Sequence, residues 1–168
     1  MERIGKINDR DIFYISTKDN SDWLNLLPTK KWVVFTIADK ENKEILHESI
    51  TRILDKNVTY TCSAGELAGL TEQYFDEEIV LRGIQNEEKT GKKYDYEQSA
   101  MTTMHQNFSE GFWFSAFCAF DEYKDINKIV CIDFTSRKVK KHLTELVEKI
   151  NNGWLPNDEE IELAEYDN

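Results

Sequence analysis

The sequence predicts an α/β fold: a single three-layer domain with a mostly parallel sheet of about four or five strands and helices on both faces. Three apolar runs, at 32–38, 58–62 and 129–134, show almost no polar alternation, which is typical of strands buried on both faces of a sheet. Between the first two runs, apolar residues recur at helical spacing on a charged segment. A strand, a helix and a second strand in this order predict parallel neighbours with a right-handed connection.

The length of 168 residues suits one domain that is large enough to bury a core. We expect a lead-in at 1–30, the core at 31–152 and an acidic C-terminal tail at 153–168. Residues 157–168 hold six acids and no base, so they supply more than half of the net charge. We find no internal repeat and no linker between domains.

Apolar spacing and helix-ending residues predict the elements around the three strands. They are an edge strand, or a lead-in that packs on the sheet, at 11–16, helical turns at 20–27, a helix running to about residue 56, helices at 66–82 and 137–152, and a short strand at 99–105. Asp39 is expected to cap the first long helix, and Thr135 or Ser136 the last. Gly83 is expected to end the helix at 66–82.

Two further features of the pattern concern apolar side chains. The apolar residues of the helix at 66–82 are Leu67, Leu70, Tyr74, Ile79 and Leu81. An aromatic segment follows at 112–120, with Phe112, Trp113, Phe114, Phe117 and Phe120. Its side chains cover more than one helical face, so we expect core rather than a ligand site, because so many exposed aromatics would promote aggregation. Both helix and strand are compatible with this segment.

The charge balance restricts the possible partners. Lys and Arg number 21 and Asp and Glu number 32, which gives a formal net charge of -11. This charge argues against nucleic acid and anionic membrane as partners, because both require a cationic surface. A basic protein, such as a toxin, is the natural complement.

The cysteines and the N-terminal residues bear on the compartment. Cys62, Cys118 and Cys131 make an odd count, and we expect buried free thiols in a reducing compartment. The first residues lack the apolar core of a signal peptide, and no apolar run reaches the length of a membrane span. We therefore expect a cytoplasmic protein.

Known catalytic and cofactor motifs do not match the chain. The segment 61–65 has Thr61 where a nucleophile elbow requires glycine, and no glycine follows the first strand for a dinucleotide. Gly91 and Lys92 do not lie on a strand-to-helix turn, and His47 has Thr51 where a zinc protease has its second histidine. We expect no cofactor and no metal, and a protein that is not an enzyme.

One enzymatic alternative remains open. Ligands of open parallel sheets bind beyond the carboxyl ends of the strands, where this chain has Asp39, His105 and Asp133. The two carboxylates could act as an acid and base pair on a small substrate, with the histidine as proton carrier. Each is equally compatible with an ordinary role, as a helix cap or a solvated side chain.

The candidate partner-binding residues lie in and before the polar segment 84–98, which is long for a connection inside a domain. This segment combines acids with two tyrosines, which are rigid amphipathic side chains suited to gripping a basic protein. The candidate residues are Asp76, Glu77, Glu78, Glu87, Glu88, Tyr94, Asp95, Tyr96 and Glu97. Alternatively, the tyrosines pack back on the sheet, Lys89, Lys92 and Lys93 keep the segment soluble, and the acids are solvated surface.

Four stretches carry a resemblance to a known family: Trp32-Val33-Val34, Cys62-Ser63-Ala64-Gly65, Phe112-Trp113-Phe114, and the closing strand and helix at 129–150. Over 31–152 the chain resembles a family of small uncharacterised bacterial α/β proteins, which implies the fold but no site. In size and acidity it is similar to the immunity proteins of bacterial toxin systems. That likeness implies an inhibitor that neutralises a toxin by occlusion.

Overall fold

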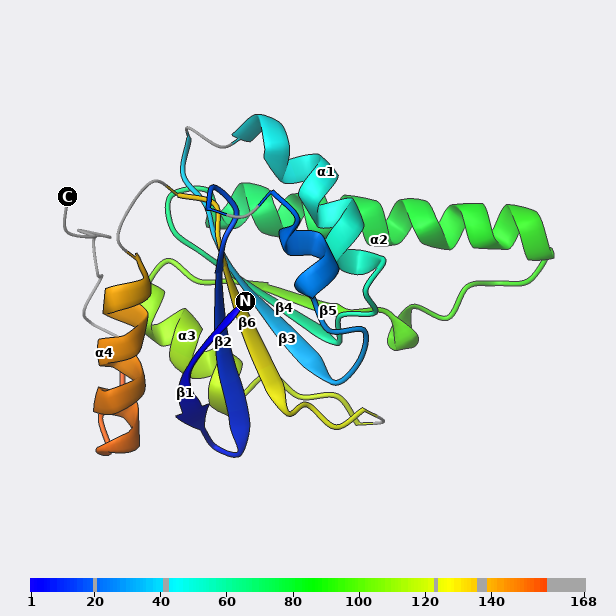
Figure 1. Ribbon diagram of the computed structural model, residues 1–168. Helices are drawn as coiled ribbons and strands as arrows, with labels where there is room; N and C mark the ends of the chain where they lie inside the picture. The colour runs from blue at the N-terminus through cyan, green and yellow to red at the C-terminus, as the bar shows by residue number, and fades with distance from the viewer. Residues whose placement is uncertain (20, 41–42, 123, 136–138, 157–168) are drawn as a thin grey trace.

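The computed structural model describes residues 1–19, 21–40, 43–122, 124–135 and 139–156, and it contains one six-stranded sheet (Figure 1). The strand order is β1-β2-β6-β3-β4-β5. Only the β1 and β2 pair is antiparallel, and every other neighbouring pair is parallel. The predicted α/β class is confirmed, with six strands in place of four or five.

The elements alternate along the chain after an initial hairpin. The strands are β1 (Glu2–Ile7), β2 (Arg10–Ser16), β3 (Trp32–Ile37), β4 (Tyr60–Ala64), β5 (Met101–Met104) and β6 (Lys128–Asp133). The helices are α1 (Lys43–Leu54), α2 (Ala68–Thr90), α3 (Phe108–Phe117) and α4 (Val139–Asn151), with short 3-10 turns at Trp23–Leu26 and Tyr96–Gln98.

The sheet is wound in two directions from β3. From β3 the chain adds β4 and then β5 on one side, and β6 returns to the other side of β3, next to β2. The carboxyl ends of β3 and β6 are therefore neighbours at the point where the strand order reverses, which is the usual ligand position in such sheets.

Each face of the sheet is covered by its own pair of helices (Figure 1). α1 and α2 pack with the side chains of Val34, Val130 and Ile132, whereas α3 and α4 pack with Phe35, Cys131 and their neighbours on the opposite face. All six residues of β3 are buried, because β3 lies between two strands and between two helical layers. This placement explains the unbroken apolar run in its sequence.

The N-terminal hairpin corrects the predicted edge strand at 11–16. That segment belongs to β2, which is internal, because β1 pairs with it on one side and β6 on the other. β1 was missed because its polar side chains are mostly exposed. The signal in the sequence was the pair Asn8 and Asp9, because Asn and Asp tolerate the positive φ angles that type I′ hairpin turns require. Both residues have positive φ angles in the structure.

The second helix is longer than predicted. α2 continues through Gly83 to Thr90, and Gly91 ends it in the left-handed conformation, with φ of 66°. The predicted boundary at Gly83 is wrong because that glycine is an interior helix residue against which the ring of Tyr96 packs. Residues 84–90 are thus helical, and the connection to β5 is shorter than expected.

The aromatic segment begins as a helix with buried side chains and ends at the surface. α3 settles the choice between helix and strand. Phe112 is fully buried, but Phe117 and Phe120 are 40% and 65% exposed, so the expectation that the whole segment is core is wrong. A ten-residue helix on one face of a sheet has a side that no other element covers.

Smaller differences concern boundaries and thiols. β4 begins two residues later than predicted, after a turn in which Asn57 has a positive φ angle. All three cysteines are free, and Cys118 is exposed rather than buried. The predicted cap Ser136 and the tail at 157–168 lie outside the described residues. Among the residues that are described, no helix is long and apolar enough to span a membrane.

Candidate interaction surface

The carboxyl ends of β3 and β6 bring Asp39 and Asp133 together, and both are buried. The side chain of Asp133 is held from two directions. The Tyr14 hydroxyl donates to Oδ2 at 2.7 Å, and the backbone N–H and hydroxyl of Thr135 both donate to Oδ1 at 2.7 Å. This carboxylate therefore ties β2 and the chain beyond β6 together.

The surroundings of Asp133 shift its pKa upward from the ordinary value. Burial raises the pKa of Asp133, the three donated hydrogen bonds oppose the rise, and the charge of Asp39 adds to it. Burial also raises the pKa of the Tyr14 hydroxyl, and the adjacent Asp133 raises it further. This phenol therefore keeps its proton and remains a donor. The arrangement is a satisfied buried network with a structural role.

His105 does not join the two carboxylates. It follows β5, and β4 lies between β5 and β3, so about 10 Å separates the two strands at a spacing of roughly 4.8 Å per strand. His105 is buried against Phe114, with ring centroids 4.8 Å apart, and burial lowers its pKa. Within the described part of the chain, no group of three or more His, Cys, Asp or Glu side chains could hold a metal ion.

The predicted partner-binding residues lie on α2 and the connection that follows it. α2 carries six acids and two bases, and its second half extends beyond the edge of the sheet (Figure 1). Asp76, Glu77 and Glu88 are exposed, as are Asp95 and Glu97 on the connection. The structure therefore places most of the predicted acids along one protruding part of the molecule.

Three large aliphatic side chains are exposed among these acids. Val80, Leu81 and Ile84 are 47%, 47% and 46% exposed. Positions 77, 81, 84 and 88 are spaced by four, three and four residues, so they form one stripe along the helix. We name Glu77, Val80, Leu81, Ile84 and Glu88 the α2 stripe: an apolar centre with an acid at each end.

The sequence missed the apolar centre of this surface. The predicted apolar residues of the helix at 66–82 include Leu81 but neither Val80 nor Ile84. The available signal was their spacing relative to Phe75, which is fully buried. At 100° per residue, Ile84 lies opposite Phe75 on the helix, so both cannot face the same layer.

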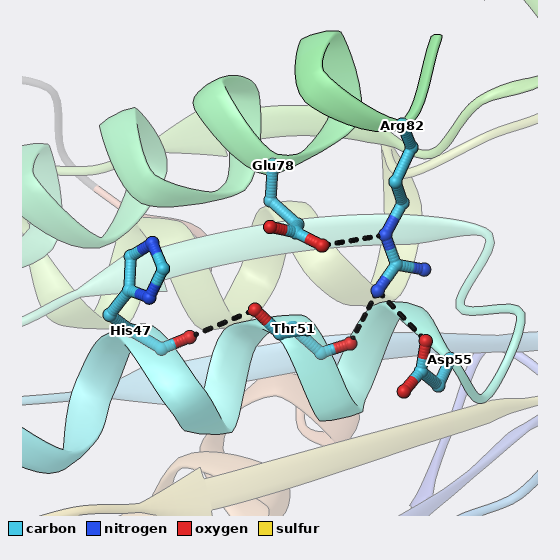
Figure 2. Close-up of polar contacts among 5 residues, drawn as sticks. All are labelled: His47, Thr51, Asp55, Glu78 and Arg82. Atoms are coloured by element: carbon cyan, nitrogen blue, oxygen red, sulfur yellow. Dashed lines mark hydrogen bonds and ion pairs between the residues drawn. The ribbon is translucent and has the colours of Figure 1, made fainter. Parts of the chain in front are cut away.

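Glu78 is not part of the exposed surface, because it is buried and paired with Arg82. Its carboxylate accepts from Arg82 Nε at 2.8 Å, and Arg82 Nη2 donates to the Thr51 carbonyl and to Asp55, both at 2.8 Å (Figure 2). Glu78 is only 9% exposed. This network joins α1 to α2, so Glu78 positions the helix and presents little surface.

The alternative that the tyrosines pack back on the sheet differs from the structure, in which Tyr96 packs on α2. The ring of Tyr96 lies against Gly83, and it contacts the ring of Tyr94 edge-on at 4.9 Å between centroids. Glu87 is half-buried and accepts from the backbone N–H of Tyr94 at 2.8 Å. Tyr96 nevertheless remains 43% exposed, so it can still contribute to a contact beside the α2 stripe.

Other charges mark the limits of this surface. Asp76 accepts from the Thr102 hydroxyl on β5, and Asp95 accepts from the backbone N–H of Glu97, so both are partly engaged. Lys89, Lys92 and Lys93 are exposed at the far end of α2 and just beyond it. The acidic surface therefore extends along α2 as far as Glu88, and these lysines mark its end.

The strand order and the helices on both faces define a doubly wound α/β protein of mostly parallel topology. Within that class, the chain belongs to the family described as domain of unknown function (DUF7684), which matches residues 12–150. No curated protein and no solved structure matches the chain. The family covers the predicted core and leaves its activity open.

Proposed function

We propose that this protein is a small acidic protein-binding protein, of the inhibitor or immunity type, which occludes a basic partner with the α2 stripe. The observation that carries the proposal is the apolar centre formed by Val80, Leu81 and Ile84 between Glu77 and Glu88. Interfaces between proteins commonly combine an apolar centre with a polar rim. The acids then provide steering toward a positively charged surface.

Charge favours a different protein over a second copy of the chain. A symmetric dimer through the α2 stripe would place two helices with a net charge of -4 each against one another. Like charges that face each other across an interface cost free energy. A partner with aliphatic side chains surrounded by Lys or Arg meets both features of the stripe.

The first test is capture of the partner from the native cytosol, followed by purification and measurement of the dissociation constant. The test variant is the double substitution Leu81→Ser and Ile84→Ser. Because both side chains are nearly half exposed, the fold should survive their change. The matched control is Ile45→Ser on α1, which removes an aliphatic side chain of equal exposure, 47%, outside the stripe.

We expect one basic partner whose purified form binds the wild type, with affinity reduced at least about tenfold by the double variant and unchanged by Ile45→Ser. Association should slow as salt rises, because screening weakens steering. Equal binding of the double variant and the control would refute the role of the stripe. Inhibition is tested separately: growth arrest by the partner alone should be relieved by co-expression of this protein.

A further inference from the structure

A groove of about 630 Å³ lies at the amino ends of the parallel strands, on the edge opposite Asp39 and Asp133. Its lining includes residues just before three strands: Lys31 before β3, Thr59 before β4 and Ala100 before β5. The underside of α2 and the connection that follows it complete the wall. The volume is typical of small-molecule sites, which span roughly 300 to 1,000 Å³.

The groove combines an apolar floor with hydroxyl groups. Leu54, Val58 and Ile79 supply aliphatic surface. On the wall, the hydroxyl oxygens of Ser99 and Tyr94 are 3.2 Å apart, and because a phenol can both donate and accept, Tyr94 can hydrogen-bond to a ligand as well as to Ser99. A flat apolar body and one hydrogen-bond acceptor would match these features.

The charges on the rim are unusual for an acidic protein. Four cations and a single acid line the groove: Lys30, Lys31, Arg82, Lys124 and Asp125. Acids behind the lining reduce this excess. Lys31 pairs with Asp125 at 3.1 Å, and Lys124 lies 3.5 Å from Asp121. Arg82 is held by Glu78 and Asp55, as Figure 2 shows.

Two cationic donors remain for a ligand. Lys30 is exposed and makes no ion pair with any described residue. Arg82 uses Nε and Nη2 in its network, and Nη1 has no hydrogen bond within the described part of the chain. Because three bonds already fix the guanidinium, binding through Nη1 requires little further ordering.

From these features we infer that the groove binds a small organic monoanion with a flat apolar body, such as an aromatic carboxylate. The apolar floor receives the body, and Lys30, Arg82 Nη1 and the Tyr94 hydroxyl receive the anionic group. A polyphosphate does not match the site, because the four acids Asp55, Glu78, Asp121 and Asp125 balance the four lining cations in formal charge, and Lys30 alone among those cations has no paired acid within the described residues. This site is separate from the α2 stripe and does not depend on its role.

The test uses three probes followed by backbone amide NMR shifts of the full chain. They are 2-naphthoate, its neutral analogue 2-naphthylmethanol, and inorganic phosphate. We expect naphthoate to shift the amides of Thr59, Ser99 and Ala100, with a dissociation constant about tenfold lower than that of the alcohol. Phosphate alone should give no saturating shifts at these positions, because it lacks the apolar body.

Substitutions locate the site. Lys30→Gln should weaken naphthoate binding about three- to tenfold, because it removes the one unpaired lysine of the rim. Lys43→Gln, an exposed lysine in the first turn of α1, is the matched control and should change nothing. Gln98→Trp should abolish binding by filling the groove from its exposed wall.

Three results would overturn the inference. One is equal affinity for naphthoate and the alcohol, which would remove the anion from recognition. The second is naphthoate shifts confined to the exposed aromatic side chains at Phe117 and Phe120. The third is an unchanged dissociation constant in both Lys30→Gln and Gln98→Trp.

Discussion

Substitution of Gly83 by alanine tests how the connection after α2 is held on that helix. A methyl group at position 83 would lie 2.7 Å from Cζ and 2.8 Å from Cε1 of Tyr96, whereas carbon atoms in contact are roughly 3.5 to 4 Å apart. The ring of Tyr96 must therefore move by about 1 Å. Because this ring is 43% exposed, it can move toward solvent without a backbone shift.

Two opposing free energies of similar size follow from this substitution. Replacement of an interior helical glycine by alanine stabilises a helix by about 0.8 to 1 kcal/mol. Displacement of Tyr96 loses its edge-on contact with Tyr94, which is worth about 0.5 to 1.5 kcal/mol. Gly83→Ala alone should thus change the free energy of unfolding by less than about 1 kcal/mol in either direction.

The coupling becomes visible in a double-mutant cycle measured by urea denaturation. In the Tyr96→Ala background the clash is absent, so Gly83→Ala should deliver its full helical gain. The matched control is Gly69→Ala in the first turn of α2, where the added methyl would meet only Met104 at 3.7 Å. Its effect should be the same in both backgrounds. Equal effects of Gly83→Ala with and without Tyr96 would refute the packing of this ring on the helix.

Three further predictions concern the core, the buried carboxylate and the thiols. Phe112→Ala should lower the free energy of unfolding by about 3 to 5 kcal/mol, and Phe117→Ala by less than about 1 kcal/mol, because only Phe112 is fully buried; equal losses in thermal or urea melts would contradict this difference. The raised pKa of Asp133 means that the folded protein keeps a proton which the unfolded chain loses near the ordinary value of 3.8, so this group's contribution to stability falls as pH rises through the raised pKa. In urea melts from about pH 3.5 to 7, the stability of Asp133→Asn relative to wild type should therefore increase with pH, and a constant difference would refute the assignment. Exposed Cys118 should react rapidly with a thiol reagent at about pH 8, whereas Cys62, whose pKa burial raises to about 12, and buried Cys131 should react only on unfolding; three equally fast thiols would be inconsistent with this burial.

Local sequence determined the strands that are buried on both faces and the helices with one continuous apolar face. The sequence predicts β3 and β6 within one residue, because nearly all their side chains are buried between two layers, and α4 within two residues, because its apolar side chains recur on the one face that is buried. Asp39 and Asp133 were expected at strand ends and do lie at adjacent ends. Their proximity follows from the return of β6 beside β3, which the sequence does not encode locally.

Tertiary structure decided whether a given glycine ends a helix and whether a given aliphatic side chain is buried or exposed. Glycine is typical of a helix end, but Gly83 lies inside α2, where the ring of Tyr96 packs against it. Leu81 has the same chemistry as a core leucine, yet it is exposed because it lies on a side of α2 turned away from the buried Phe75. Periodicity gives the face on which a side chain lies, and only the packed neighbours decide whether that face is covered.

The groove shows the same limit most clearly. Lys30, Arg82 and Tyr94 are far apart in the sequence and form no motif, and each alone reads as an ordinary surface residue. They line one cavity because parallel strands bring all their amino ends to one edge and α2 extends over that edge. Charge and hydrophobic pattern thus determined that the protein is acidic and α/β, whereas the arrangement of the strands determined that Lys30, Arg82 and Tyr94 line one groove, since that arrangement depends on contacts between distant segments.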